Sequence, residues 1–481
     1  MAYRFGDRHQ QTLLPPGIED YVSPDAPVRA YDAFVDALDL EALGIEFDTC
    51  KVGNSSYDPR TMLKLLVYGY SYGVRSSRKL ERETNYNLSF IWLMGGLKPD
   101  HKTIAEFRRN NKNALGKVLK QCARLCLKLD LIAGNTLFID GSKVRANACL
   151  NQQWSKTRCR KRLEKIDRRI EEILTECDRM DDQESGSGSL VKMKKELTDQ
   201  ETLRSKVKSV LEELQVSEKT TVNTTDPECV RIHGRQGSHA GYNMQTVVDE
   251  KHGLIVNADV VSENNDLRQF VNQTKQAHKT LGQPSQTVCA DAGYCSYDKL
   301  EELDSKKLQM IVPSPRQSST KVVKPFDRSE FQYDSKRDVY ICPAGEVMTY
   351  RGIENKTKKI YRVGARVCRQ CRHFGGCTKS HKKGRKVIRN LNEEFRERLQ
   401  KEYEKPESQE IYKLRKQKVE LPFGHIKRNL NAGHFLMRGL DGVRAEASLL
   451  ASCFNISRMI TLIGVPALIM ISHIRQGQCF S

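Results

Sequence analysis

Three acidic side chains have settings suited to chemistry on phosphates. Asp140 and Asp291 each end a short apolar run and are each followed by a small residue, whereas Glu420 lies in a basic, helical segment. Carboxylates on two strands and a helix would supply the oxygen ligands that Mg²⁺ prefers. Two such ions can activate an attacking oxygen and stabilise a leaving oxygen at a phosphodiester. We therefore expect Asp140, Asp291 and Glu420 to meet, to hold two Mg²⁺ ions and to act on DNA.

A single aspartate at the end of a strand is more often a turn former or a cap than a catalyst. The case for a catalytic role is stronger for Asp140 and Asp291, because each follows an apolar run and precedes a small residue. The small residue would let a phosphate approach the backbone. Asp249 competes for the second position but lies in a hairpin-turn signature. Asp259 and Asp266 are interpreted as structural.

The segment around Glu420 predicts one helical face that carries a phenol, a cation and a carboxylate. Tyr412, Lys416 and Glu420 are four residues apart and would lie on that face. An ordinary surface pair of Lys416 and Glu420 is the alternative. Pro422 is expected to kink or end the helix, so that Lys427 would reach a phosphate from a following helix.

The composition favours a nucleic-acid partner. The chain has 481 residues, which predicts two or three domains, and its formal net charge is +20. Basic residues occur in all regions, which argues against a membrane-surface role. The start of the chain lacks the pattern of a signal peptide, and the run 459–472 is too short for a membrane span. We expect a cytoplasmic protein whose 15 cysteines are reduced thiols, which could bind metal where they cluster.

The elements that would position these residues fall into several parts. Residues 1–128 predict a helical amino-terminal DNA-binding domain, in which Asp58 and Thr103 cap helices and Arg75 and Arg78 contact phosphates. A plain helical bundle whose charges only solvate it is the alternative. Residues 129–154 and 221–313 predict the first part of an α/β catalytic domain with a mixed sheet, and residues 391–481 its helical carboxy-terminal part.

Two insertions interrupt the α/β domain. Residues 155–220 carry apolar residues at helical spacing on both sides of a Ser-Gly run, which predicts a charged helical hairpin. Lys and Arg residues at the base of this hairpin allow a second interpretation, in which it clamps the DNA backbone. Residues 314–390 form a basic insertion with four cysteines that could hold a structural Zn²⁺ in tetrahedral geometry; ordinary reduced thiols are the alternative. These cysteines are Cys342, Cys368, Cys371 and Cys377.

The chain resembles the DDE transposases of bacterial insertion sequences. The resemblance covers most of the chain and is carried by Asp140-Gly141-Ser142, by the stretch 290–294, and by a Tyr-Arg-Glu-Lys signature. The residues of that signature are Tyr412, Arg415, Glu420 and Lys427. The family places three residues between arginine and glutamate, whereas four separate Arg415 from Glu420. Lys416 has the family's spacing, so either residue could take the arginine's part.

The resemblance implies a ribonuclease-H-like catalytic fold and a Mg²⁺-dependent enzyme with Asp140, Asp291 and Glu420 as its metal-binding acids. It also implies binding to terminal inverted repeats on double-stranded DNA, strand cleavage and strand transfer into a target. Because two element ends must be held together, we expect a homo-oligomer on DNA. A transposon-derived DNA-binding protein without catalysis and a ribonuclease-H-like nuclease without strand transfer are the alternatives.

Overall fold

The computed structural model describes residues 17–45, 57–181, 187–216, 220–234, 237–304, 307–318, 325–354 and 358–470. The chain divides into two compact units, the first made of residues 1–285 and 416–481 and the second of residues 286–415. Helix α15 (Pro406–Arg428) contributes residues to both.

Short helices occupy the described part of residues 17–128, as the sequence predicts. Helix α3 begins after Asp58, whose carboxylate accepts hydrogen bonds from the amides of Arg60 and Thr61 at 3.3 and 2.8 Å. Helix α6 is capped by Asp100, which accepts from the amide of Thr103 at 2.7 Å, so the prediction that Thr103 is the cap is wrong. The helices are α1 (Pro27–Asp36), α2 (Leu40–Leu43), α3 (Pro59–Ser71), α4 (Ser77–Tyr86), α5 (Leu88–Leu93), α6 (His101–Asn110), α7 (Lys112–Leu115) and α8 (Val118–Lys128).

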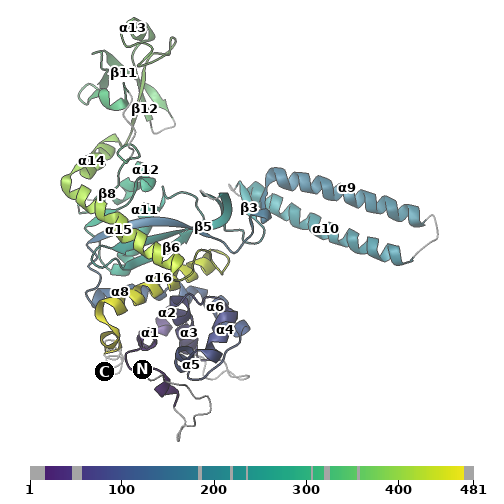
Figure 1. Ribbon diagram of the computed structural model, residues 1–481. Helices are drawn as coiled ribbons and strands as arrows, with labels where there is room; N and C mark the ends of the chain where they lie inside the picture. The colour runs from purple at the N-terminus through teal and green to yellow at the C-terminus, as the bar shows by residue number, and fades with distance from the viewer. Residues whose placement is uncertain are drawn as a thin grey trace, which may run out of the picture. The chain divides into compact units, whose positions relative to one another are not determined.

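The sheet of the first unit is organised around one long strand, β5 (Gly237–Asp249). It pairs antiparallel with β1 (Thr136–Arg145), β4 (Val230–Gly234) and β6 (Ile255–Val261). The β5–β6 hairpin lies within residues 221–313, for which the sequence predicts an α/β domain with a mixed sheet. Residues 240–249 are buried without alternation, because α11 (Gln269–Leu281) contacts β5 and β6 while α16 also contacts β6 (Figure 1).

Helix α16 (Leu440–Ile463) joins helices α1–α8, the front helices, to this sheet. It contacts α3, α7, α8 and β6, and most of its residues are buried. Asn455 inserts a polar contact: its side chain accepts from the amide of Ile255 and donates to the carbonyl of the same residue, both at 2.8 Å. This helix lies within residues 391–481, for which the sequence predicts a helical carboxy-terminal part.

Residues 155–220 form the predicted hairpin. Helices α9 (Lys156–Asp181) and α10 (Ser187–Val216) lie side by side, and the short strands β2 (Gln153–Ser155) and β3 (Thr221–Asn223) pair at their base (Figure 1). The apolar repeats produce the contact, because Ile166, Val207 and Leu214 are buried between the helices. The hairpin has its own small core.

The second unit contains a parallel strand pair and a separate antiparallel sheet. β7 (Thr287–Cys289) pairs in parallel with β8 (Gln309–Ile311), and α12 (Tyr297–Leu300) lies between them in the chain. The antiparallel sheet has the order β13–β12–β11–β10–β9. Its strands are β9 (Gln332–Asp334), β10 (Val339–Ile341), β11 (Val347–Glu354), β12 (Lys358–Arg362) and β13 (Lys386–Asn390), accompanied by α13 (Ala365–Gln370) and followed by α14 (Glu393–Glu404).

The protein is therefore of mixed α/β class, with both antiparallel and parallel strand pairing and with helices around the sheets. Across the described residues, no helix combines the length and apolar character needed to span a membrane.

Candidate active site

Asp140 lies in the middle of β1 and not at its end. The strand continues to Arg145 because β5 keeps pairing with it, with Asp140 opposite Thr246 and Arg145 opposite Gly241. The expectation that Asp140 sits where a strand ends is thus wrong. The side chain is half-buried, and by the alternation of a strand it shares a face with Ser142.

The opposite face of β1 explains why glycine follows Asp140. A side chain at Gly141 would bring its Cβ to 2.4 Å from Gln245 Nε2 and 2.7 Å from Asp266 Oδ1. These atoms belong to a network in which Asp266 accepts from the amide groups of Asn243 and Gln245, both at 2.7 Å. Lys143 approaches the same carboxylate oxygen at 3.4 Å. Gly141 therefore makes room for this polar network, whereas the sequence interpretation assigned the space to a phosphate.

Lys427 reaches the face of β1 that carries Asp140. Its ammonium group donates to Ser142 Oγ at 2.7 Å and to the carbonyl oxygen of Lys143 at 2.9 Å. Burial lowers the pKa of Lys427, because both acceptors are neutral while the charged form has lost water. An anionic group brought to this amine would restore that lost stabilisation.

A second lysine of α15 fixes how the helix runs beside β1. Lys418 donates to the carbonyl oxygen of Glu250, and the amide of Glu250 donates to the carbonyl oxygen of Thr136, the first residue of β1. Helix and strand therefore run in the same direction, anchored near Thr136 by Lys418 and near Ser142 by Lys427. Glu420, which is exposed, lies between the two anchors on the helix, as Asp140 does on the strand.

Pro422 does not end α15. The helix continues through it to Arg428, and Pro422 and Phe423 are buried while Glu420 is exposed. The expected end of the helix after Glu420 is therefore wrong, and Lys427 belongs to the same helix as Glu420. They are seven positions apart, close to two helical turns, so both lie on one side of α15.

Asp291 belongs to the second unit, where it follows β7. Its carboxylate caps a short 3₁₀ turn by accepting from the amide of Gly293 at 2.9 Å. The phenol of Tyr412 is electrostatically close to Asp291, although burial is the main reason why its pKa is raised. The guanidinium of Arg415 lies 5.5 Å from the centre of the Tyr412 ring. Within this unit, Asp291, Tyr412 and Arg415 are thus neighbours.

The two candidates for the signature's arginine differ in environment. Arg415 is half-buried against Tyr412, whereas Lys416 is exposed. A guanidinium on an aromatic ring keeps a fixed orientation, which suits bidentate binding of a phosphate. The environment favours Arg415 over Lys416, in spite of the extra residue before Glu420.

The competing acids have structural contacts. Asp249 is fully buried and accepts from the amides of Gly134 at 2.8 Å, Lys251 at 3.0 Å and Ala133 at 3.3 Å. Burial raises its pKa in spite of these donors. Asp259 is bound by Arg444 at 2.8 Å. These contacts give both aspartates a structural role: Asp249 holds a turn, and Asp259 holds helix α16.

The two arginines assigned to phosphates in the front helices also differ. Arg78 is exposed on α4, but Arg75 is only 4% exposed. Arg75 donates to the carbonyls of Asn431 and His434 and forms an ion pair with the fully buried Glu446. A phosphate role for Arg75 is therefore wrong, because the guanidinium is committed inside the protein.

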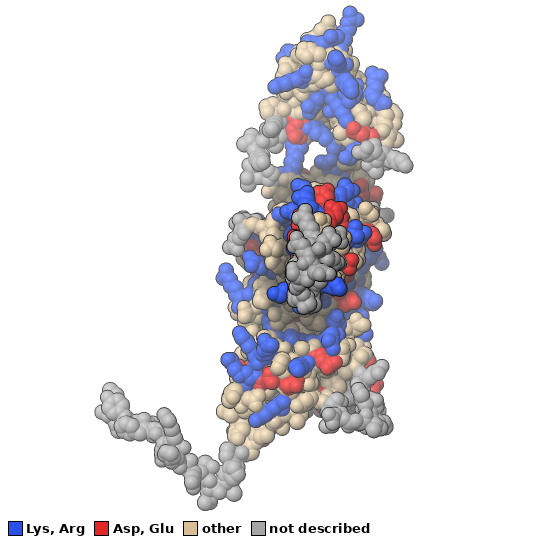
Figure 2. All heavy atoms as spheres, turned by 90° about the vertical axis from the view of Figure 1, so that its right-hand side faces the viewer, with Lys and Arg blue, Asp and Glu red and all other residues tan. Residues whose placement is uncertain are grey.

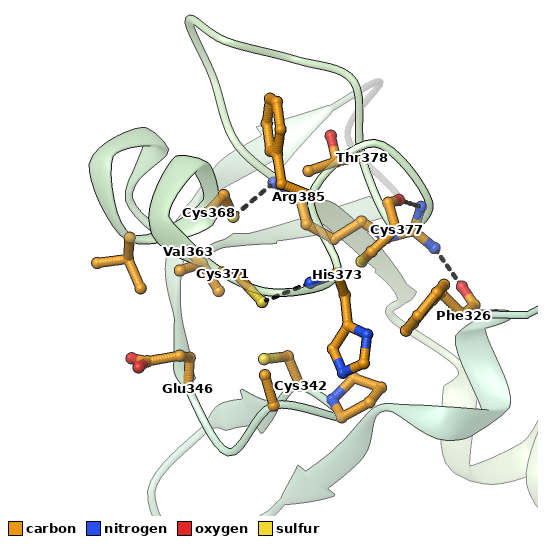
Figure 3. Close-up of a pocket in the computed structure, with 14 residues that line it drawn as sticks. Phe326, Cys342, Glu346, Val363, Cys368, Cys371, His373, Cys377, Thr378 and Arg385 are labelled. Carbon is orange, nitrogen blue, oxygen red and sulfur yellow. Dashed lines mark hydrogen bonds between the residues drawn. The ribbon is translucent and has the colours of Figure 1, made fainter.

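Four of the cysteines of the second unit, Cys342, Cys368, Cys371 and Cys377, line a single cavity (Figure 3). Over the described ranges, however, no three or more His, Cys, Asp or Glu side chains are already arranged to hold a metal ion. All four thiols are free.

The comparisons with known proteins bear on these residues. Residues 217–456 match the family model described as a transposase DDE domain, and residues 16–110 match one described as a transposase domain. Both matches support an insertion-sequence transposase. The DDE match includes Asp291, Glu420 and Lys427, whereas Asp140 lies before it. No curated protein and no solved structure matches the chain.

Several residues at the site were missed by sequence reasoning. Ser142 and Lys418 fix α15 beside β1, and Asn243 and Gln245 fill the space beside Gly141. The spacing of Asn243 and Gln245 was a usable signal, because two amides at alternate positions of a buried strand need polar partners on one face.

Proposed function

We propose that this protein is the DNA transposase of a bacterial insertion sequence, and that Asp140, Asp291 and Glu420 are its metal-binding acids. It would bind terminal inverted repeats, cleave DNA strands and transfer them to target DNA on a ribonuclease-H-like domain. The observation that carries the proposal is the contact of Lys427 with Ser142. It joins the helix of Glu420 to the face of β1 that carries Asp140. The two transposase-domain matches support the reaction class.

The donor set fits divalent metal ions that prefer oxygen. Asp140 is half-buried and Glu420 is exposed, so at least one carboxylate is open to a solvated ion and its phosphate. Two Mg²⁺ ions held there would supply charge stabilisation for an attacking and a leaving oxygen. The proposed order is attack by water, followed by attack of the freed 3′ hydroxyl on target DNA.

The chain's own residues would orient the DNA. Lys427 presents a partly desolvated ammonium group on the side of β1 that carries Asp140, where it would hold a phosphate oxygen. Tyr412 and Arg415 would do the same beside Asp291, with Lys416 as a more exposed contact. Arg78 would contribute to binding of the element ends from the front helices.

Substitution of one acid separates this proposal from its alternatives. Purified Glu420→Gln protein should bind DNA carrying the element ends normally but lose cleavage by about 10³-fold or more, the scale of removing a preorganised electrostatic group. Glu410→Gln is the matched control, because Glu410 is an exposed carboxylate on the same helix and pairs with the exposed Lys413. Cleavage and strand transfer are measured on labelled DNA with Mg²⁺.

Each outcome decides between functions. Unchanged cleavage by Glu420→Gln would refute the site. Binding without cleavage by the unmodified protein would favour a DNA-binding protein derived from a transposon. Cleavage without joining to target DNA would favour a nuclease.

A further inference from the structure

The cavity lined by Cys342, Cys368, Cys371 and Cys377 has no part in the chemistry proposed above. It measures about 30 Å³, enough for one small occupant, and its walls also include Phe326, Val363 and Pro343. Figure 3 shows the four sulfur-bearing side chains around this space, contributed by the end of β10, by α13 and by the turn after it.

Tight backbone turns present these thiols. Cys342 opens the turn between β10 and β11: its carbonyl accepts from Gly345 at 2.8 Å and its amide donates to Glu346 at 2.9 Å. Gly345 has a φ of +84°, which the turn requires. Cys368 and Cys371 are joined by a similar turn, in which the amide of Cys371 donates to the carbonyl of Cys368 at 3.3 Å.

Two of the sulfur atoms already accept backbone hydrogen bonds. The amide of Arg385 donates to Cys368 Sγ at 3.3 Å, and the amide of His373 donates to Cys371 Sγ at 3.5 Å (Figure 3). Amide donors to sulfur stabilise a thiolate more than a thiol, and they orient it as outer partners orient metal ligands. The guanidinium of Arg385 is held nearby by the carbonyls of Cys377 at 2.9 Å and Phe326 at 2.7 Å.

We propose that these four cysteines bind one structural Zn²⁺ as thiolates. Four soft sulfur ligands with no open position are the donor set of a closed tetrahedral zinc site. The net negative charge of such a site would be offset by Arg385. Because the thiols of the described chain are not yet in ligand geometry, binding must draw them inward to Zn–S distances of about 2.3 Å.

His373 also lines the cavity but is occupied in another way. Its ring packs against Phe326 with the ring centres 4.9 Å apart, and its Nε2 accepts from Arg372 at 3.1 Å. The fourth ligand is therefore Cys342, which reaches the cavity from the opposite turn and closes the site across the sheet.

The need for a metal follows from the size of the surrounding core. Seven buried residues form the apolar cluster of the β9–β13 sheet, with Cys368 among them. Between β12 and β13 the chain has only helix α13 and one isolated bridge, Phe374 to Thr378, among its described residues. Zn²⁺ would tie this segment to the β10–β11 turn and would couple metal binding to folding.

Metal analysis of the full-length protein, purified under reducing conditions without added chelator, tests the proposal. We expect about one zinc per chain by elemental analysis and loss of most of it in Cys371→Ser. Cys149→Ser is the matched control, because Cys149 is exposed in the other unit and should leave the zinc content unchanged.

A spectroscopic test covers the case in which Cys371→Ser fails to fold. Replacement of zinc by Co²⁺ in the unmodified protein should give the intense thiolate-to-cobalt absorption of a four-sulfur tetrahedral site. A chelator should then make four thiols newly reactive to a thiol reagent. Absence of zinc, disulfides among these cysteines, unchanged zinc in Cys371→Ser, or a cobalt spectrum without thiolate bands would each overturn the proposal.

Discussion

Arg75 and Lys427 are two cations that the sequence assigns to the same task and that the structure places in opposite situations. Arg75 is nearly inaccessible and faces the carboxylate of Glu446, so its charge is matched within the protein. Lys427 is partly buried and donates hydrogen bonds to a hydroxyl and a carbonyl, which are neutral acceptors. A matched charge supports the fold, whereas a charge held among neutral acceptors is ready for an anion.

Substitution of Arg75 should give the largest effect on stability. Arg75→Met leaves Glu446 buried without its partner and should lower the free energy of unfolding by about 3–5 kcal/mol, measured by urea denaturation. Lys79→Met, an exposed change in helix α4, which begins two residues after Arg75, should cost less than about 0.5 kcal/mol. A stable Arg75→Met protein that has lost DNA binding would reverse the comparison, because Arg75 would then be a phosphate contact.

Substitution of Lys427 should act on the reaction more than on the fold. Lys427→Met should reduce strand cleavage by roughly 10²-fold, the scale of removing one charge-stabilising donor, with a small change in unfolding free energy. Single-turnover cleavage of end DNA measures the effect. If cleavage is unchanged while stability falls, Lys427 is a structural cation like Arg75.

The lowered pKa of Lys427 adds a dependence on pH. A lysine whose pKa is lowered by burial loses its proton at a lower pH than an ordinary lysine, so cleavage should decline on the alkaline side earlier than exposed lysines titrate. Lys427→Arg should move that decline to higher pH, because arginine stays protonated. An identical alkaline limb in both proteins would exclude titration of Lys427 as its cause.

Substitution of Arg78, an exposed cation, should give the smallest effect, a modest loss of DNA binding. Arg78→Gln should weaken binding of end DNA modestly and reduce the slope of log affinity against log salt by about 1. Arg82→Gln is a matched control on the same exposed helix, where Arg82 already pairs with Glu83 at 3.0 Å. If Arg78→Gln leaves the salt slope unchanged, Arg78 does not contact a DNA phosphate.

Basic side chains also gather outside the front helices. Figure 2 shows Lys and Arg crowded over the antiparallel sheet of the second unit, with few Asp and Glu on the face in view. Arg351, Lys358, Arg366, Arg369 and Lys382 are among its exposed residues. Their exposure places them with Arg78 and not with Arg75, as charges that are available to DNA phosphates.

Local patterns were predictable where a few neighbouring residues decide the outcome. Spacing and residue type alone indicate the helix cap at Asp58, the hairpin of α9 and α10, and the strands β5 and β6. The length of β1 was not predictable, because its extension beyond Asp140 depends on pairing with a strand a hundred residues away.

The candidate site was only partly predictable for the same reason. The burial of Arg75 depends on Glu446, and the position of α15 depends on the contacts of Lys418 with Glu250 and of Lys427 with β1. Those partners are distant in sequence, so neither charge nor helix propensity indicates them. The acids themselves were chosen by local pattern and by resemblance, and their roles remain predictions.

The short pairing of β2 with β3 gives the α9–α10 hairpin an unusual freedom. Gln153 lies opposite Asn223, so the chain departs from the body of the first unit and returns to it one strand spacing away, about 5 Å. Because the two ends of this hairpin are adjacent, it can be shortened, or replaced by another segment, without stretching the rest of the chain. The length of this hairpin can thus change at its far end, while the residues that pack on Val222 at its base stay in place.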